Sequence, residues 1–328
     1  MKKISLLLPL ILALIPHTSA ADDRIITVAR NGGDFSNVID AIESITDASN
    51  ITRYVISLGP GIFYLNGQQL VMKPYVSLVG AGKNVTFLQS YRNSTGSISR
   101  FSGTQPGCGV IEISENSSVE NMTVRNFGTG VGDVACGIET SISGGNDTST
   151  LKDVDIILSG NNELKVGIIN SRTIILDTVS VSIDNIGDSI GILGLSNIRA
   201  NNIDISARSR NGESIGMDLE SSAVTISNSS IWAQDYGVKT FPNEIFINIA
   251  NTDLNAAIAF VENDVSGVDP IFDIRGSTLN NIRSEGVFDF SNNPGTRLTN
   301  SSVGSIINDD SNQNCHNVID TNLALIDC

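Results

Sequence analysis

Hydrophobic and polar positions alternate in a short motif that returns throughout the chain from Ser117 onward. The motif reads apolar, any residue, a small residue or Asn/Asp, any residue, a small polar residue, apolar. Its third position recurs at intervals of 23 to 32 residues. These centres are Asn121, Asp153, Thr178, Asn202, Asn228, Asn251, Gly276 and Asn300. A fixed period of this size predicts a solenoid.

Two aliphatic columns flank these centres. Two residues before the centres stand Val119, Leu151, Leu176, Ala200, Ile226, Ile249, Ile274 and Leu298. Three residues after them stand Val124, Ile156, Val181, Ile205, Ile231, Leu254, Leu279 and Val303. Turns stacked at ~4.8 Å would bring like positions together on parallel strands, with the aliphatic columns inside. The Asn and Asp centres mark a bend, because these residues tolerate unusual backbone angles.

The pattern therefore predicts an all-β fold, a right-handed parallel β-helix. The handedness follows from the chirality of parallel crossovers. At ~25 residues per repeat the chain would form roughly ten coils. Leucine-rich and helical solenoids are disfavoured, since no unit shows their consensus.

The N-terminal module, residues 21–90, predicts strands at 25–29, 53–58, 76–79 and 84–89. Phe35, Val38, Ile39, Ile42 and Ile45 recur at helical spacing, which predicts a helix with Ser36 as its N-cap. This helix would cap the open end of the solenoid, where unpaired strand groups invite aggregation. We expect residues 91–109 to form a surface loop and residues 110–328 to form repeat coils, so that 21–328 is a single domain.

Residues 1–20 have the composition of a signal peptide. Lys2 and Lys3 precede an apolar run at 6–15, and small residues follow at 18–21. No later segment is long and apolar enough for a membrane helix. We therefore expect a secreted or periplasmic protein without membrane insertion.

The net charge of −15 makes nucleic acid and anionic lipid poor partners. Four cysteines allow three pairings. Cys108–Cys136 and Cys315–Cys328 are favoured because each pair is close along the chain, and each could contribute ~3 kcal/mol. Four free thiols are the alternative. No zinc spacing is present.

Glycines followed by an apolar residue give a second register. They are Gly137, Gly167, Gly191, Gly216, Gly237 and Gly286, and their distance from the preceding motif centre shortens toward the C-terminus. This predicts longer loops over the N-terminal repeats, which would form a wall beside a groove.

Acidic residues precede these glycines, at Asp133, Glu163, Asp188, Glu213 and Asp235. They would form a ridge that binds cations or sugars, or else they are solvated turn residues. Asp188, Glu213 and Asp235 are the candidate catalytic residues. No metal site or cofactor is predicted, although the ridge leaves calcium as an alternative ligand. Arg208 and Arg210 lie in one of these loops and are candidate binding residues.

Histidine chemistry is nearly excluded, because His316 is the only histidine beyond the signal peptide. A serine–histidine site or a histidine metal cluster cannot be built with confidence from this one residue. Trp232 is the only tryptophan, and Gln234 and Tyr236 lie close by. These three residues are the candidate carbohydrate contacts. The alternative is an edge aromatic that packs on its own coil.

The N-terminal module resembles a known family. Residues 26–35 (ITVARNGGDF), 54–64 (YVISLGPGIFY) and 76–83 (VSLVGAGK) look like the opening of pectin methylesterases. The resemblance implies the right-handed parallel β-helix of the pectin-lyase-like superfamily.

The catalytic residues do not follow that resemblance. Gln234-Asp235 is similar to the family's Gln-Asp step, and residues 287–290 with Arg297 are similar to its second aspartate segment. Asp235 and Asp289 are two repeats apart, however, so ~10 Å would separate them along the axis. We therefore do not expect methylesterase activity.

Three functions remain open. The first is a non-catalytic exported protein that binds a polysaccharide or a cell-surface glycan. The second is a diverged polysaccharide lyase, esterase or glycoside hydrolase. The third is a structural or adhesive surface protein. The oligomeric state is left open.

Overall fold

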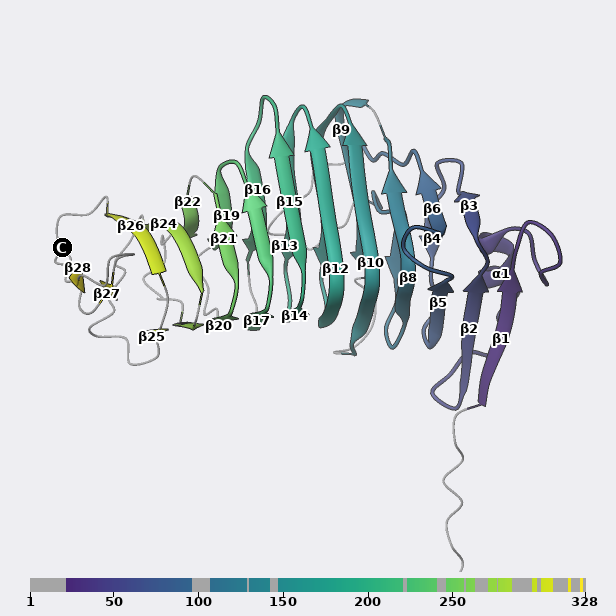
Figure 1. Cartoon of the computed structure of the whole chain (residues 1–328). Coiled ribbons are helices and arrows are strands. Elements are labelled where there is room, and N and C mark those ends of the chain that lie inside the picture. The colour runs from purple at the N-terminus through teal and green to yellow at the C-terminus, as the bar shows by residue number, and fades with distance from the viewer. Residues whose placement is uncertain are drawn as a thin grey trace, which may run out of the picture.

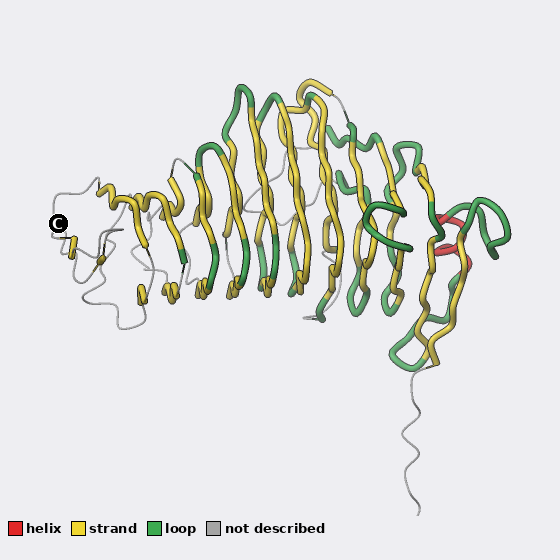
Figure 2. Tube along the Cα trace, in the orientation of Figure 1, coloured by secondary structure: helices red, strands yellow, loops and turns green. Residues whose placement is uncertain are grey.

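The chain folds as a parallel β-solenoid in the computed structural model (Figure 1). The structure describes residues 22–95, 107–128, 130–141, 147–220, 223–240, 246–256, 258–262, 271–275, 277–284, 297–299, 302–308, 318–319 and 325–326. One sheet of parallel strands contains nearly every element, and helix α1 (Val38–Ser44), red in Figure 2, lies at its N-terminal end.

The strands form three sides of the solenoid. The first side contains β1 (Asp22–Val28), β2 (Thr52–Leu58), β5 (Val76–Gly80), β14 (Ile198–Asn201), β17 (Ala223–Ser227), β20 (Phe246–Ala250), β23 (Ile271–Arg275) and β25 (Arg297–Thr299). The second side contains β3 (Gly61–Tyr64), β6 (Thr86–Ser90), β15 (Asp204–Ser209), β18 (Ser230–Ala233) and β21 (Asp253–Asn255). The third side contains β4 (Leu70–Val71), β7 (Ile111–Ile113), β9 (Gly130–Thr140), β11 (Asn162–Asn170), β13 (Asp188–Gly194), β16 (Ser214–Leu219), β19 (Tyr236–Thr240) and β22 (Ile258–Glu262).

Longer strands pass from one side to the next. The strands β8 (Ser118–Asn126), β10 (Ser149–Gly160) and β12 (Ile174–Asn185) stand side by side and run from the first side into the second (Figure 1). The strands β24 (Thr278–Ser284) and β26 (Ser302–Asn308) run from the second side into the third. A separate antiparallel pair, β27 (Val318–Ile319) and β28 (Leu325–Ile326), lies near the C-terminus.

The predicted aliphatic columns form the core. Val124, Ile156, Val181, Ile205, Ile231, Leu254 and Leu279 are in register on successive strands and are at most 1% exposed. The other column, from Val119 to Ile274, is buried as well. Each fully buried aliphatic side chain contributes roughly 1.5–3 kcal/mol relative to exposure. These columns therefore provide the main drive for stacking.

The predicted bend is a corner between the first and second sides. Asn121, Asp153, Thr178, Asn202, Asn228 and Asn251 all have φ between 50° and 58°. Asn and Asp adopt this left-handed conformation more readily than other non-glycine residues. Their side chains also bond along the axis: Asn202 Nδ2 donates to Thr178 Oγ1 (3.3 Å), and Asn251 Nδ2 donates to Asn228 Oδ1 (3.3 Å).

Five of the six predicted register glycines, Gly137 to Gly237, lie on the third side, where the backbone closely approaches the core. Gly286 lies outside the described residues. A Cβ atom on Gly191 would overlap the carbonyl oxygen of Gly216 and the Cγ2 atom of Ile205. Gly167 and Gly216 face the same restriction from Val181 and Ile231. These positions therefore need glycine because there is no room for a side chain.

The longer intervals between the motif centre and the following glycine consist mostly of strand residues. The prediction of long loops over these repeats was therefore wrong. After the motif, β10 continues to Gly160 and β12 continues to Asn185. Apolar alternation sustains them, because Leu158 and Ile183 are buried beyond the central column. On the following strands of the second side, the position equivalent to Leu158 and Ile183 is alanine: Ala207, Ala233 and Ala256. Because alanine is smaller, the second side becomes narrower toward the C-terminus.

Helix α1 occupies the predicted segment, with Val38, Ala41 and Ile42 buried. Its N-cap is Asn37, whose Oδ1 accepts a hydrogen bond from Ile39 N (2.9 Å), so the prediction of Ser36 was wrong by one residue. Either residue type can cap a helix, and sequence alone did not fix the first turn. The role of the helix as a cap of the solenoid stays a prediction, as does the handedness of the coil.

From β8 to β24 the chain completes about seven turns, fewer than the roughly ten coils predicted. The prediction divided the whole mature chain by one period, although the N-terminal module does not follow the motif.

Replacing Gly191 with alanine should destabilise the protein by about 1–3 kcal/mol, because the added methyl group overpacks the core. The measurement is the free energy of unfolding from urea denaturation. Gly59→Ala is the matched control, since a Cβ atom there meets Ala29 Cβ at an ordinary 3.4 Å. Equal stability of the two variants would contradict the close approach at Gly191.

Candidate functional site

The outer face of the second side carries a strip of mostly short polar side chains, which is buried at Thr123 and partly or fully exposed from Asp155 onward. We call it the strip and define it by two columns. The first column is Thr123, Asp155, Ser180, Asp204, Ser230, Asp253 and Thr278. The second, two residues further along each strand, is Arg125, Ile157, Ser182, Ser206, Trp232 and Asn255. Both columns run parallel to the axis of the solenoid.

Trp232 is the one large aromatic residue among these short side chains. It points outward from β18, between the core residues Ile231 and Ala233, and is partly exposed. Its neighbours in register are Ser206 and Asn255. Because these neighbours are short, the indole ring stands above the strip. An apolar ring with hydroxyl, amide and carboxylate groups around it is complementary to a sugar, whose faces carry C–H groups and whose rim carries hydroxyls.

More aromatic residues lie at the N-terminal end of the strip. Tyr64 and Tyr91 are 50% and 55% exposed. The ring centroids of Tyr91 and Phe127 are 6.4 Å apart, and the Arg125 guanidinium lies 4.0 Å from the centroid of Phe87. Sequence reasoning missed this group, because three of its aromatic residues precede the repeats and no motif aligns them. The signal that could have found it is the strand register, which pairs Tyr64 with Gln89 and Gln89 with Arg125.

Ion pairs border the strip on both sides. Lys83 Nζ lies 3.1 Å from Asp155 Oδ1. On the other border, Arg210 Nη2 lies 2.8 Å from Asp184 Oδ2, and this hydrogen bond lowers the pKa of Asp184. Both pairs are partly exposed, so each adds little stability. The candidate binding residue Arg208 is exposed on β15, two residues beyond Ser206, and thus lies beside the strip.

The three candidate catalytic acids lie at the start of neighbouring strands of the third side, and each has a structural partner. Asp188 is the first residue of β13, and Glu213 and Asp235 directly precede β16 and β19. Asp188 Oδ1 accepts a hydrogen bond from Glu213 N (2.8 Å). Asp235 Oδ2 accepts bonds from the Ser214 N–H (2.8 Å) and hydroxyl (2.9 Å). Glu213 pairs with Lys239 Nζ at 3.2 Å. These carboxylates therefore hold one turn against the next.

The other candidate carbohydrate contacts do not gather around Trp232. Gln234 Oε1 accepts a hydrogen bond from Ser209 N (2.8 Å), which fixes the turn after β18. Tyr236 is on β19, on the third side, where Lys239 Nζ lies 4.9 Å from its ring centroid. The proximity of Trp232 and Tyr236 in sequence is thus lost in the fold, because a corner of the solenoid separates them.

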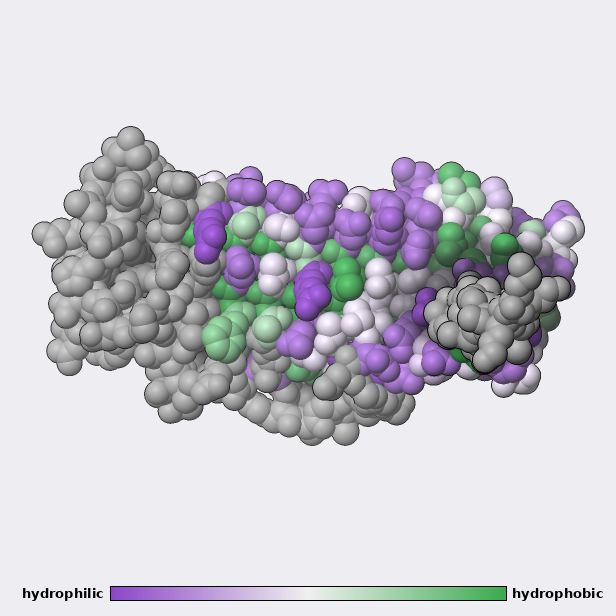
Figure 3. All heavy atoms as spheres, turned by 90° about the horizontal axis from the view of Figure 1, so that it is seen from below, coloured by the Kyte–Doolittle hydropathy of each residue, from purple (hydrophilic) through white to green (hydrophobic). Residues whose placement is uncertain are grey.

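A shallow hollow of about 420 Å³ lies on the first side. Its lining residues are Ile175, Leu176, Asp177, Arg199, Ala200, Asn201, Thr225 and Ser227. Figure 3 shows this side from below, with hydrophobic residues along its centre and hydrophilic ones at its margins. Phe246, which is 54% exposed, follows Ala223 in register on this side. The hollow lies on a different face from the strip.

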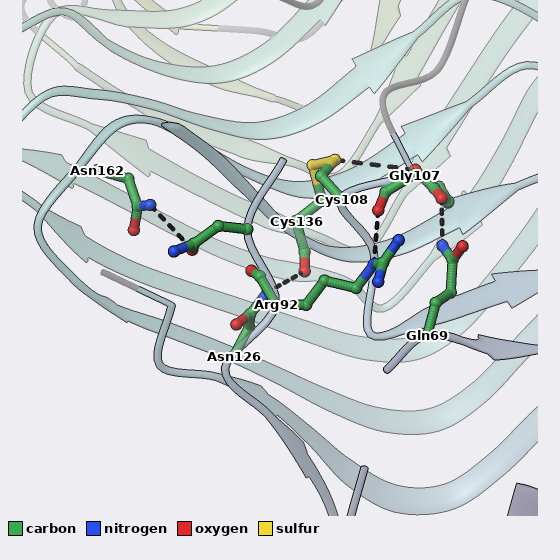
Figure 4. The surroundings of a disulfide bond; sticks show 9 residues. Gln69, Arg92, Gly107, Cys108, Asn126, Cys136 and Asn162 are labelled. Atoms are coloured by element: carbon green, nitrogen blue, oxygen red, sulfur yellow. Dashed lines mark hydrogen bonds between the residues drawn. A yellow bond between two sulfur atoms is a disulfide. The ribbon is translucent and has the colours of Figure 1, made fainter. Parts of the chain in front are cut away.

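A disulfide joins Cys108 to Cys136, with 5.0 Å between their Cα atoms (Figure 4). The Arg92 side chain braces the adjoining loop, donating to the carbonyl oxygens of Gly107 (2.6 Å) and Gly67 (3.2 Å). Cys315, Cys328 and His316 lie outside the described residues, as do the signal peptide and the segment 287–290.

A buried carboxyl group beside this disulfide was missed by sequence reasoning. Glu139 is 1% exposed, accepts a hydrogen bond from Gln69 Nε2, and lies in register with Glu112 on β7. Burial raises the pKa of Glu139, and the nearby Glu112 carboxylate adds to the rise. No motif marks this residue, because its neighbours in the same column are Ile169 and Leu193.

Lys165 is a second buried ionisable group. Its amino group donates to Asn162 Oδ1 (2.6 Å) and Gly128 O (3.1 Å), and burial lowers its pKa to about 8. These bonds satisfy the amine inside the third side, where it links the start of β11 to Gly128.

Within the described ranges, no three His, Cys, Asp or Glu side chains gather as metal ligands. No helix in the same ranges is long and apolar enough to cross a membrane.

No family model matches the sequence, and no curated protein matches it. Among solved structures, the chain is similar to the pectin methylesterase of Aspergillus niger at 13% identity and a TM-score of 0.46, covering 86% of this chain and 91% of that one. It is similar to the pectin methylesterase of carrot at 12% identity and a TM-score of 0.39, covering 86% and 88%. It is also similar to the A-module of the mannuronan C-5 epimerase AlgE6 of Azotobacter vinelandii at 15% identity and a TM-score of 0.36, covering 82% and 88%.

These proteins are parallel β-helices of the pectin-lyase-like fold, which the N-terminal module resembles. Sequence identities and TM-scores this low give no information about the activity of this chain. The β-solenoid assignment rests on the strand register of this chain itself.

Glu139→Gln should make the protein more stable at neutral pH and leave its stability at acidic pH nearly unchanged. The pKa of Glu139 is raised above 4.5, so its favourable contribution is complete below that value and is lost as pH rises through the folded-state pKa. Urea denaturation across pH measures the effect. Glu163→Gln, at an exposed position, is the control. An identical pH dependence in wild type and Glu139→Gln would show that Glu139 does not titrate abnormally.

Proposed function

We propose that the protein is an exported β-solenoid that binds a polysaccharide chain along the strip. The observation that carries this proposal is the position of Trp232, an outward-facing indole between Ser206 and Asn255 on an exposed polar surface. The aromatic group at the other end of the strip supports a ligand that extends along the axis. A polymer fits this shape better than a small molecule, because the surface is long and flat.

Binding is favoured over catalysis by the state of the candidate acids. Asp188 accepts a hydrogen bond from a backbone N–H of the next turn, Asp235 accepts one from the preceding turn, and Glu213 is paired with Lys239. A general acid or base must be within reach of a substrate proton, and these groups are occupied by the fold. Asp188 begins β13 and Glu213 directly precedes β16, both on the third side, whereas Asp235 lies in the turn between β18 and β19.

Export is part of the proposal. The predicted signal peptide at residues 1–20 and the disulfide between Cys108 and Cys136 are both typical of an oxidising compartment. The partner is a polysaccharide or a glycan of a cell surface. Nucleic acid is disfavoured, because the net charge is −15.

Trp232→Ala should weaken polysaccharide binding about tenfold or more, since an aromatic anchor supplies a large share of such a contact. The measurement is retardation in native gels that contain soluble plant, bacterial or fungal polysaccharides, followed by calorimetry with the best ligand. Phe246→Ala is the matched control, because it removes an exposed aromatic from the first side.

Loss of binding in Phe246→Ala but not in Trp232→Ala would move the site to the hollow of the first side. New reducing ends, unsaturated products or methanol in the same incubations would show an enzyme. Absence of binding to every polymer would favour the structural or adhesive alternative.

A further inference from the structure

Carboxylates occur at every second position of the first column of the strip. Asp155 is in register with Ser180, Ser180 with Asp204, Asp204 with Ser230, and Ser230 with Asp253. At ~4.8 Å per strand, successive aspartates are about 10 Å apart. Small hydroxyl residues fill the positions between them.

Two of these carboxylates are available to a ligand. Asp155 pairs with Lys83. Asp204 and Asp253 are exposed, and within the described residues no Lys or Arg forms an ion pair with either. They lie on the strands directly before and after β18, which carries Trp232. The aromatic platform is thus flanked by two negative charges on the same border.

This spacing corresponds to the chemistry of an extended 1,4-linked glycan. When the links are β-1,4, each sugar is turned by about half a rotation relative to the last, so alternate sugars present the same edge. One sugar is about as long as the step between strands, and a disaccharide unit is about as long as two steps. A sugar stacked on Trp232 would therefore have neighbours whose equivalent edges face Asp204 and Asp253.

Building on the proposed function, we infer that the ligand is a linear polysaccharide of amino sugars with free ammonium groups. Ammonium groups on alternate sugars would form charge-assisted hydrogen bonds with Asp204 and Asp253. A polyuronate would place its carboxylates against these residues, which like-charge repulsion opposes. A neutral glycan would contact Trp232 equally well but would gain nothing from the charges.

Each exposed ammonium–carboxylate contact is weak by itself. A polymer that makes both contacts while stacked on Trp232 gains from their combination, because the later contacts are intramolecular. Affinity should therefore rise with chain length up to the three sugars that span β15, β18 and β21, and it should fall with salt.

The test compares four hexamers by calorimetry at mildly acidic pH and low salt. The probes are hexamers of glucosamine, N-acetylglucosamine, glucose (1,4-linked) and galacturonate. The glucosamine hexamer should bind about tenfold tighter than its N-acetylated form, which is a difference of about 1.4 kcal/mol. The galacturonate hexamer should bind weakest.

Variants locate the effect. Asp204→Asn and Asp253→Asn should each weaken glucosamine binding several-fold and reduce its salt dependence, while binding of the glucose hexamer stays unchanged. Ser230→Ala, between the two on the same column, is the matched control. Equal affinity for all four hexamers, or wild-type glucosamine binding in Asp204→Asn/Asp253→Asn, would overturn the inference but leave the strip as a glycan site. Failure of every hexamer to bind, with Trp232→Ala indistinguishable from wild type, would instead overturn the proposed function.

Discussion

Parallel stacking in register is the interaction on which the rest of this structure depends. Each strand bonds to the equivalent strand of the next turn, so a residue's environment is set by its counterparts on either side. The buried row from Val124 to Leu279 is held this way, and its exposure of at most 1% throughout shows how strictly the register is kept. The glycines of the third side follow from the same stacking, because the backbone there must lie close to that row.

The same register organises the surface. Whatever faces outward at one turn lies ~4.8 Å from its counterpart on the next, so chemical groups form lines along the axis. A binding surface on such a protein is linear, and its period is set by the backbone. The strip is one such line, and the corner between the first and second sides, from Asn121 to Asn251, is another. The two lie on adjoining parts of the same turns.

Sequence predicted the fold well where position in the repeat determines the environment. The aliphatic columns, the left-handed bend and the glycine register were all visible in the order of residues. Prediction from the sequence failed where the local structure depends on contacts outside the repeat. Leu158 and Ile183 extend strands that were predicted as loops, because burial beyond the motif leaves no periodic signal. The estimate of roughly ten coils failed for a related reason, since the N-terminal module does not follow the repeat.

The site was predictable only in part. Trp232 lies on the strip and Arg208 lies beside it, but Tyr236 and Gln234 were grouped with them only by nearness in the chain, and the fold places them at and beyond the next corner. Tyr64 and Phe87 escaped notice because the register alone brings them beside Arg125. Glu139 escaped notice because its buried setting comes from Gln69 and the disulfide, far away in sequence.

In the first column of the strip, aspartate occupies every second winding, and serine or threonine occupies the windings between. Whole windings of a solenoid can be gained or lost without disturbing the core, because every winding presents the same aliphatic residues inward. Such a change is not neutral for the outer column. Excision of two adjacent windings would leave the acidic and hydroxyl residues in phase, whereas excision of one would set two residues of the same kind side by side. The chain can therefore vary in length freely as a scaffold, but only in even steps as a surface.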